Sequence, residues 1–302
     1  MRLVSYRKKE SGSKFRMGYI TENEQIVDIH LTSQKAFQAG NTTVELPYQP
    51  ELFYQEGQFF IDEATKLVGK IKDSEFTFSM NDIQLGMPLG TAKKVICVGK
   101  NYADHVAEMK SDIPEFPVLF AKFDNAIIGP EDEIHFSSAT EKLDYEVELT
   151  IVIGKEASHV HEENALDYVA GYTIGNDTSA RDLQKRTPQW LQGKSLDHTT
   201  PIGPWIVTKN EILDPGNLTI ASYVNNEKRQ YSNTKHLIFS VPYLVSFISN
   251  LITLKPGDII MTGTPDGVGF AMNPPGYVKD RDKIKLVIEG IGVMENVVKK
   301  VL

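Results

Sequence analysis

The sequence contains a single cysteine, Cys97, among its 302 residues. One cysteine cannot form an intrachain disulfide, so a small secreted domain held together by disulfides is excluded. The chain also lacks the HExxH and CxxC spacings that hold zinc through histidine and cysteine. Cys97 lies within an apolar run, and we expect it to act as a small buried hydrophobic side chain. The expected compartment is the cytoplasm.

Long hydrophobic runs and an excess of positive charge are missing as well. No run of about 18 apolar residues occurs, which argues against a transmembrane helix and a membrane partner. The first ten residues have no apolar core of the kind that a secretory signal requires. Lys and Arg number 32 against 40 Asp and Glu, a net charge of −8, which argues against a nucleic-acid surface. The 41% of hydrophobic residues is enough for a sizeable core.

Segments typical of strands outnumber segments typical of helices and do not alternate with them, which favours a β-rich α+β fold. We predict a small N-terminal α/β domain, residues 1–88, and a larger domain, residues 89–302, joined where glycine and proline interrupt the pattern at 87–90. Strands are expected at 3–7, 15–20 and 25–29 and a helix at 57–71 in the first domain, and strands at 94–98, 118–123, 143–153, 170–174, 202–207, 218–224, 259–262 and 283–288 and a helix at 237–254 in the second. Asn225 and Asn226 predict a hairpin turn.

The stretch 143–154 predicts a strand that carries acidic side chains. Because side chains alternate across a strand, Glu146 and Glu148 share one face. The strand then becomes apolar on both faces, as in a covered sheet. Desolvating two anions without a partner is costly, and a bound divalent cation would remove that cost. An amphipathic edge strand with two solvated glutamates explains the strand alone equally well.

A third acid, Asp177, ends another apolar run and precedes a segment, 178–184, that resembles the first turns of a helix. Ser179 and Asp182 are spaced like a capping box, and a turn or helix-cap role for Asp177 is a sound alternative. Three carboxylates converging from two strands would instead form an oxygen-rich site for a hard cation such as Mg²⁺.

Further polar residues could complete a catalytic site. His105 and Glu108 are three apart in a segment with helical character, so their side chains neighbour each other, either as a base and its partner or as an ordinary surface pair. Arg181 and Lys194 gather positive charge after Asp177, together with Lys185 and Arg186, for which a solvated helix face is the better interpretation. The glycine-rich stretch 263–269 lacks the GK[ST] ending of a phosphate loop.

Five motifs in order along the chain resemble the fumarylacetoacetate hydrolase family, particularly its shorter bacterial members and their acylpyruvase and oxaloacetate decarboxylase relatives. They lie at 96–105, 143–149, 175–184, 193–195 and 263–269. The resemblance runs from about Lys94 to about Gly292. It implies a mixed β-sandwich roll with short helices, and a homodimer. It also implies these site residues: Glu146, Glu148 and Asp177 as metal ligands, His105, Glu108 and Lys194 as catalytic residues, and Arg181, Gln184 and Thr264 as substrate-binding residues.

We therefore predict a hydrolase or lyase that uses Mg²⁺ or Mn²⁺, with Ca²⁺ as a further candidate, to cleave a C–C bond in a small 2-oxo, enolisable carboxylate such as an acylpyruvate or oxaloacetate. One alternative is an isomerase or decarboxylase of 2-hydroxymuconate-type dioates from aromatic catabolism. Another is a non-catalytic metal-binding module, against which the presence of His105, Glu108 and Lys194 argues. The region before the motifs is shorter than the N-terminal domain of the long eukaryotic members, which argues against fumarylacetoacetate itself as substrate.

Overall fold

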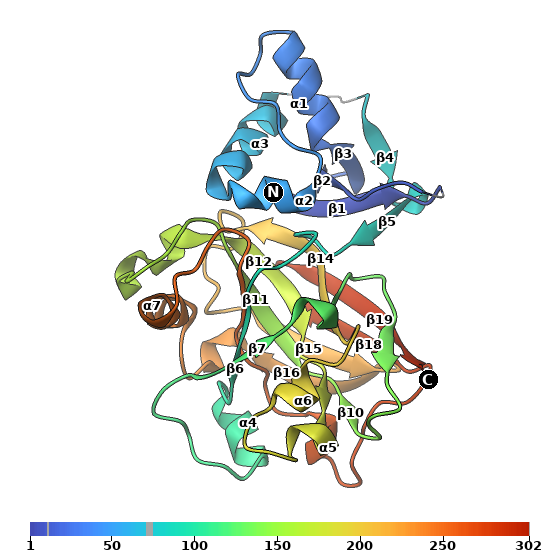
Figure 1. Cartoon of the computed structure of the whole chain (residues 1–302), viewed down its shortest axis with the longest axis vertical. Helices are drawn as coiled ribbons and strands as arrows, with labels where there is room; N and C mark the ends of the chain where they lie inside the picture. Colours follow the sequence, from blue (N-terminus) through green and yellow to red (C-terminus); the bar gives the residue numbers. More distant parts are fainter. Residues whose placement is uncertain (11, 71–74, 302) are drawn as a thin grey trace.

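The computed structural model describes residues 1–10, 12–70 and 75–301 (Figure 1). A small unit at one end of the molecule contains the first strands and three helices, and a larger β-rich unit contains the rest. The elements of the small unit are β1 (Arg2–Lys8), β2 (Arg16–Ile20), β3 (Gln25–Asp28), α1 (Ile29–Gln38), α2 (Pro50–Gln55), α3 (Gln58–Lys70), β4 (Thr77–Ser79) and β5 (Ile83–Gly86). The three predicted strands are confirmed, as is the helix predicted over 57–71, of which residue 71 lies outside the described residues. The elements α1, α2, β4 and β5 were not predicted.

The helix α1 begins where the local sequence supplies a cap. Asp28 precedes it in an extended conformation, and its carboxylate accepts a hydrogen bond from the Leu31 N–H at 2.7 Å. This bond satisfies one of the free N–H groups of the first turn. The same buried carboxylate accepts hydrogen bonds from Tyr6 and Arg16, so it joins the helix to β1 and β2. Asp28 thus links β1, β2 and α1 of the small unit through its side chain.

A single large sheet runs through both units. Its strand order is β4-β3-β2-β1-β14-β12-β11-β17-β6-β7, and β1 pairs with β14 through Leu3 opposite Ile206. The strands that enter it from the larger unit are β6 (Val95–Gly99), β7 (Val118–Lys122), β11 (Val147–Ile153), β12 (Val169–Asn176), β14 (Thr200–Thr208) and β17 (Ile259–Met261). The division between domains at residues 88 and 89 stays a prediction, because the sheet and its hydrogen bonds continue across it.

A second sheet packs against the first. It consists of β16 (Glu227–Asn233), β15 (Thr219–Val224), β18 (Lys283–Ile288), β19 (Gly292–Lys300) and β9 (Ile134–Phe136), in that order. Leu149 and Ile151 of β11 join one buried cluster with Ile220 and Leu286 of this sheet, while Val152 faces a second cluster. Every residue of β11 is buried, as expected for a strand covered on both faces. The predicted β-rich α+β fold is confirmed.

The remaining elements are short, apart from one helix that covers the sandwich. They are α4 (Ala103–Glu108), β8 (Ile127–Ile128), β10 (Leu143–Asp144), β13 (Ser179–Ala180), α5 (Arg181–Gln184), α6 (Leu191–Lys194) and the longer α7 (Val241–Leu251). Figure 1 shows α4, α5 and α6 at the end of the molecule away from the small unit. The predicted hairpin between β15 and β16 is confirmed, and Asn225 and Asn226 have φ values of 52° and 67°, as a tight turn of this kind requires.

Two local predictions differ from the structure. The strand predicted over 143–153 is interrupted at Tyr145 and Glu146, because β10 pairs with β13 whereas β11 pairs with β12. The capping box is wrong: the residue before α5 is Ala180, which provides no side-chain cap, and the Asp182 carboxylate accepts hydrogen bonds from Thr140, Glu141 and Leu183. A change of pairing partner is a long-range event that the local alternation of residues does not report.

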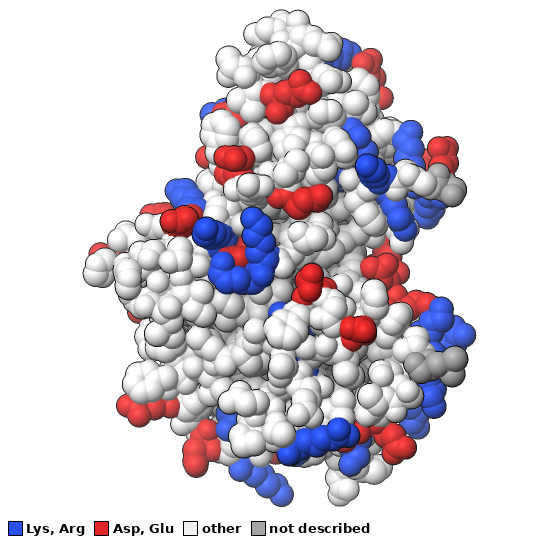
Figure 2. Space-filling model, viewed as in Figure 1, with Lys and Arg blue, Asp and Glu red and all other residues white. Residues whose placement is uncertain are grey.

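On the face that Figure 2 shows, acidic and basic side chains are interspersed, and no extended basic surface is present on that face. Among the described residues, no helix is both long enough and apolar enough to cross a membrane.

Candidate metal-binding active site

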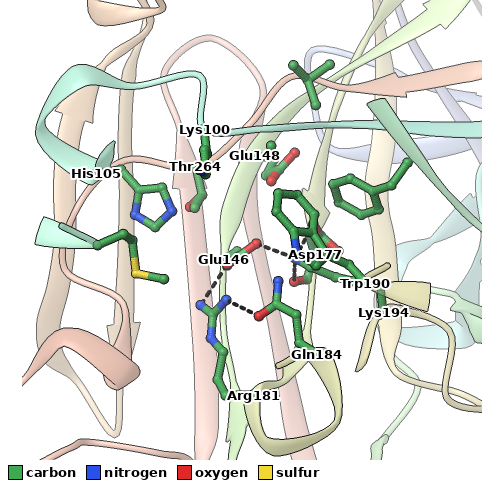
Figure 3. Close-up of a pocket in the computed structure, with 14 residues that line it drawn as sticks. Lys100, His105, Glu146, Glu148, Asp177, Arg181, Gln184, Trp190, Lys194 and Thr264 are labelled. Carbon is green, nitrogen blue, oxygen red and sulfur yellow. Dashed lines mark hydrogen bonds and ion pairs between the residues drawn. The ribbon is translucent and has the colours of Figure 1, made fainter. Parts of the chain in front are cut away.

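Three predicted acids meet in the larger unit. Ligand oxygens of Glu146, Glu148 and Asp177 all lie within 4.8 Å of one another, and all three residues are buried. Glu148 belongs to β11, Glu146 precedes that strand, and Asp177 follows β12 (Figure 3). The pairing of β11 with β12 extends to this point, because the Asp177 N–H donates to the Glu146 carbonyl oxygen at 2.9 Å. The sheet register therefore brings the acids together.

Lys194 and Arg181 neutralise part of this charge. The Lys194 ammonium donates to Glu146 Oε2 at 2.7 Å and to Asp177 Oδ2 at 2.6 Å. The Arg181 guanidinium lies 2.7 Å from Glu146 Oε1 through its Nη2. Although burial alone would raise it, these two cations hold the pKa of the Glu146 carboxyl below its usual range. Both cations come from the short helices that follow Asp177, as the sequence motif predicted for their position.

Two buried charges near the acids were missed from the sequence. The Lys122 ammonium, at the end of β7, donates to Asp177 Oδ1 at 2.7 Å and is fully buried. Asp144 accepts a hydrogen bond from Arg181 Nε at 2.8 Å, and also from the Gly269 and Phe270 N–H groups. The sequence does contain a sign of the Lys122 contact, because Lys122 ends an apolar strand and a buried ammonium requires an acid nearby.

Glu148 is the acid that these cations leave unbalanced. Four buried carboxylates, including Asp144, face three buried cations, and among the described residues no ion pair involves Glu148. Its carboxylate accepts one hydrogen bond, from the Gly263 N–H at 2.8 Å. Burial, and then the neighbouring charges of Asp177 and Glu146, raise the pKa of Glu148 well above its usual range. An all-oxygen donor set with excess negative charge fits a hard divalent cation, so these residues fit Mg²⁺ or Mn²⁺.

His105 and Glu108 lie together beside these acids. His105 Nδ1 is 2.8 Å from Glu108 Oε1, and the histidine ring lines the same pocket as the acids. The second carboxylate oxygen of Glu108 accepts a hydrogen bond from the Gly267 N–H at 3.0 Å, which ties α4 to the glycine-rich loop 263–269. Figure 3 shows His105 on one side of the pocket and Lys194 and Trp190 on the other. The pair is therefore positioned toward the site and is not an exposed surface pair.

Gln184 and Thr264 also line the pocket. Gln184 Oε1 accepts a hydrogen bond from Arg181 Nη1 at 3.1 Å, so its amide nitrogen is the group left to donate a hydrogen bond to a ligand. The Thr264 hydroxyl donates to the Val147 carbonyl oxygen at 2.9 Å and accepts from Gln230 Nε2 at 2.7 Å. Their roles toward a substrate stay predictions. Lys185 and Arg186 are exposed outside this pocket, but they follow the end of α5 at Gln184, so the helix predicted to carry them is shorter than expected.

Aromatic side chains close one wall. The Trp190 ring packs on Gly99, where a Cβ atom would lie 2.4 Å from the ring, so a larger residue cannot fit there without movement. Phe120 meets Trp190 edge-on, with ring centroids 5.4 Å apart. The cavity volume is about 60 Å³, which is room for a few water-sized groups. A pocket of this size fits a small ligand better than a large one.

Comparison with known sequences agrees with this geometry. Residues 94–299 match the family model described as fumarylacetoacetate (FAA) hydrolase C-terminal. The chain is 40% identical over 289 residues to oxaloacetate tautomerase YisK of Bacillus subtilis (strain 168), covering 93% of this chain and 95% of that protein. It is 36% identical over 299 residues to the mitochondrial oxaloacetate tautomerase fahd2 of Xenopus laevis, covering 98% of this chain and 89% of that protein.

Solved structures with the same fold include enzymes of other reactions. The 5-carboxymethyl-2-hydroxymuconate delta-isomerase of Mycobacterium smegmatis matches all of both chains with 32% identity and a TM-score of 0.75. The maleylpyruvate hydrolase of Sphingobium sp. SYK-6, solved in complex with manganese(II) and pyruvate, matches all of both chains with 26% identity and a TM-score of 0.76. On the family match and these identities, the chain belongs to the fumarylacetoacetate hydrolase family of enzymes.

Proposed function

We propose that this protein is a divalent-metal-dependent enzyme that interconverts the keto and enol forms of a small 2-oxo dicarboxylate, with oxaloacetate as the leading substrate. The observation that carries the proposal is the buried cluster of Glu146, Glu148 and Asp177, in which Glu148 has no cationic partner among the described residues. The relatives named oxaloacetate tautomerase, which match nearly the whole chain, support the choice of reaction.

The three acids would hold Mg²⁺ or Mn²⁺, with Ca²⁺ as a weaker candidate. When bound, the ion would supply Lewis acidity where the substrate carboxylate and the adjacent 2-oxo group reach the acids. Lys194 bridges Glu146 and Asp177 and adds fixed positive charge beside the 2-oxo group of the substrate. This charge would stabilise the negative charge that develops on the 2-oxo oxygen as the enolate forms. Arg181 keeps Glu146 in position, and Gln184 and Thr264 line the space left for the substrate.

His105 is the residue suited to move the proton. Conversion of the keto to the enol form requires a base that removes a proton from C3 and an acid that delivers a proton to the C2 oxygen, and the reverse reaction returns a proton to C3. Because His105 Nδ1 is engaged by Glu108, Nε2 is the ring nitrogen left to exchange a proton with the substrate. Glu108 fixes the tautomer and stabilises the imidazolium. On the opposite side of the pocket, Trp190 and Phe120 would keep bulk water from the substrate.

Cleavage of a C–C bond is the second candidate, either hydrolysis of an acylpyruvate or decarboxylation of oxaloacetate. The same His105–Glu108 pair is suited to activating a water molecule, and a solved relative that binds manganese and pyruvate is a maleylpyruvate hydrolase. Isomerisation of a 2-hydroxymuconate-type dioate also proceeds through proton transfer at an enolisable carbon, and a second solved relative bears that name. Hydrolysis, decarboxylation and isomerisation would each use the site that we propose for tautomerisation.

A substrate panel with the metal-free, Mg²⁺-loaded and Mn²⁺-loaded protein tests the proposal. Enol absorbance reports tautomerisation of oxaloacetate, and pyruvate release reports decarboxylation and acetylpyruvate hydrolysis. We expect metal-dependent tautomerisation well above the rate with free metal alone, and its loss in Asp177→Asn. Glu163→Gln, an exposed acid outside the site, is the matched control. Absence of metal-dependent tautomerisation, with rapid turnover of acetylpyruvate, would replace this function with the second candidate.

We further propose that the protein forms a homodimer, an expectation carried by the family resemblance. Size-exclusion chromatography with light scattering should give twice the mass of one chain. A mass of one chain at working concentrations contradicts it.

A further inference from the structure

Lys100 lines the pocket that contains the three acids, and no described residue neutralises it. The other two pocket cations are committed: Lys194 holds Glu146 and Asp177, and Arg181 holds Asp144 and Glu146. The ammonium of Lys100, in contrast, has no hydrogen bond or ion pair within the part of the chain that the structure describes. A positive charge at the edge of a small acidic pocket remains available to a ligand.

The backbone fixes where this lysine stands. Lys100 follows β6 and has a φ of 58°, in the left-handed region that side chains other than glycine seldom adopt. On one side, Trp190 covers Gly99. On the other, the buried Asn101 amide donates to the Phe239 and Thr262 carbonyl oxygens, at 3.1 and 2.7 Å. A lysine held in an unfavourable backbone conformation between two anchored neighbours suggests a role at the site.

Figure 3 shows Lys100 and Thr264 on the side of the pocket where His105 lies, and across from Lys194 and Trp190. The acids lie between these two sides. A 2-oxo acid whose carboxylate and oxo group reach the acids beside Lys194 would extend its far end toward Lys100. The long, flexible stem of lysine allows the charge to follow a ligand group at the pocket edge.

We infer that Lys100 is a specificity-determining residue that binds the second carboxylate of the substrate, so that the pocket selects 2-oxo dicarboxylates over 2-oxo monocarboxylates. The inference rests on the proposed function, because that function places the 2-oxo end of the substrate at the acids. The inference adds to that function a requirement for a negative charge on the distal group of the substrate. A charged hydrogen bond from lysine to carboxylate is stronger than one between neutral groups. Its strength sets the difference in affinity between dicarboxylates and monocarboxylates.

The test compares Lys100→Met with the unaltered protein, both loaded with Mn²⁺. Lys100→Arg, which keeps the charge, and Lys93→Met, which removes an exposed lysine outside the pocket, are the controls. Oxaloacetate and 2-oxobutyrate form the matched ligand pair, since they differ in having a carboxylate or a methyl group at C4. Calorimetry measures the Kd of 2-oxobutyrate and of oxalate, which mimics the carboxylate and the adjacent oxygen and has no distal group, and kinetics measure the KM of oxaloacetate.

We expect Lys100→Met to raise the KM of oxaloacetate by about 10- to 100-fold, as for loss of one charged hydrogen bond. The Kd values of oxalate and 2-oxobutyrate should stay within about twofold, Lys100→Arg should restore most of the KM, and Lys93→Met should change nothing. Equal losses for all three ligands, or no loss for oxaloacetate, would overturn the inference and leave the proposed function standing. Failure of the unaltered protein to bind oxalate and to act on oxaloacetate would overturn both.

Discussion

At the scale of single residues, the site is a set of buried charges that balance one another except at Glu148. Lys122, Lys194 and Arg181 satisfy the carboxylates around them. Glu148 has only the Gly263 N–H as a hydrogen-bond donor among the described residues. Removing one member of a paired set leaves a buried charge without a partner, which is strongly destabilising. Neutralising Glu148, which has no cationic partner among the described residues, should therefore not destabilise the metal-free protein.

Glu148→Gln should weaken Mn²⁺ binding by at least about tenfold, on the order of one lost charged ligand, and should abolish turnover. The glutamine oxygen can still accept the Gly263 N–H, so the melting temperature of the metal-free protein should not fall. Calorimetry and thermal unfolding measure the two effects, with Glu163→Gln as control. If Mn²⁺ affinity stays the same in Glu148→Gln and also in single substitutions of Glu146 and Asp177, the three acids are not the metal site.

His105→Ala should separate the reactions that this site could perform. A positioned base contributes about 10²–10⁴-fold to a step that moves a proton, so tautomerisation and acylpyruvate hydrolysis should slow by that order. Decarboxylation of oxaloacetate depends first on stabilising the enolate and should slow less. Mn²⁺ affinity should stay nearly constant, and His161→Ala at an exposed position should be silent. An equal loss for decarboxylation would assign His105 to a step that all the reactions share.

The sequence predicted most residues of the site but not their partners. Glu146, Glu148, Asp177, Lys194 and His105 fall in the motifs that carry the resemblance, and the structure places them around one pocket. For Lys122 the sequence predicts only a place in a strand. Its contact with Asp177 spans 55 positions and depends on the pairing of β7 with β6, which no local pattern encodes.

At the scale of elements, the segment after β6 is anchored at its start, where the Asn101 amide donates to the Phe239 and Thr262 carbonyl oxygens, and has weaker contacts farther along. Glu108 of α4 accepts the Gly267 N–H, which links the helix to the glycine-rich loop. Farther along, Phe116 stacks on Phe247 of α7 with ring centroids 6.4 Å apart, although 57% of Phe116 is exposed. Beyond this anchor, the Glu108 hydrogen bond and the exposed ring contact are weak restraints compared with the paired strands β11 and β12. This segment is therefore the part of the site expected to open first.

Hydrogen exchange should show residues 101–117 behaving as a lid over the pocket. With Mn²⁺ present, added oxalate should slow exchange in this segment and leave β11 unchanged, because ligand contacts favour the closed arrangement. Phe116→Ala should speed exchange in the segment without oxalate, since it removes the contact with Phe247. Equal protection with and without oxalate would contradict a ligand-gated lid.

At the scale of the whole molecule, the small unit completes the large sheet. The strand β1 pairs with β14, and Leu3 and Met17 share a buried cluster with Val152 and Ile206. A fragment beginning at residue 89 would expose the backbone edge of β14 and this apolar surface, which is a typical cause of aggregation. The two predicted domains are thus expected to depend on each other for stability.

Residues 89–302 expressed alone should aggregate or melt well below the full chain. The loss has two sources, the β1–β14 hydrogen bonds and the apolar surface shared with the small unit. Size-exclusion chromatography and thermal unfolding, run beside the full chain, measure it. A monodisperse fragment with an unchanged melting temperature would establish residues 89–302 as an independent folding unit.

Because Cys97 is buried, the movement predicted for residues 101–117 can be followed by spectroscopy. Its thiol lies in the core, 3.8 Å from the Met261 sulfur, and burial followed by the negative charge of Asp177 raises its pKa well above its usual range. Maleimide reagents require a thiolate that they can reach, so the native thiol should remain unlabelled in the folded protein. A cysteine introduced at Ile113, which is 61% exposed, would then be the sole site for a fluorophore or spin label reporting lid movement.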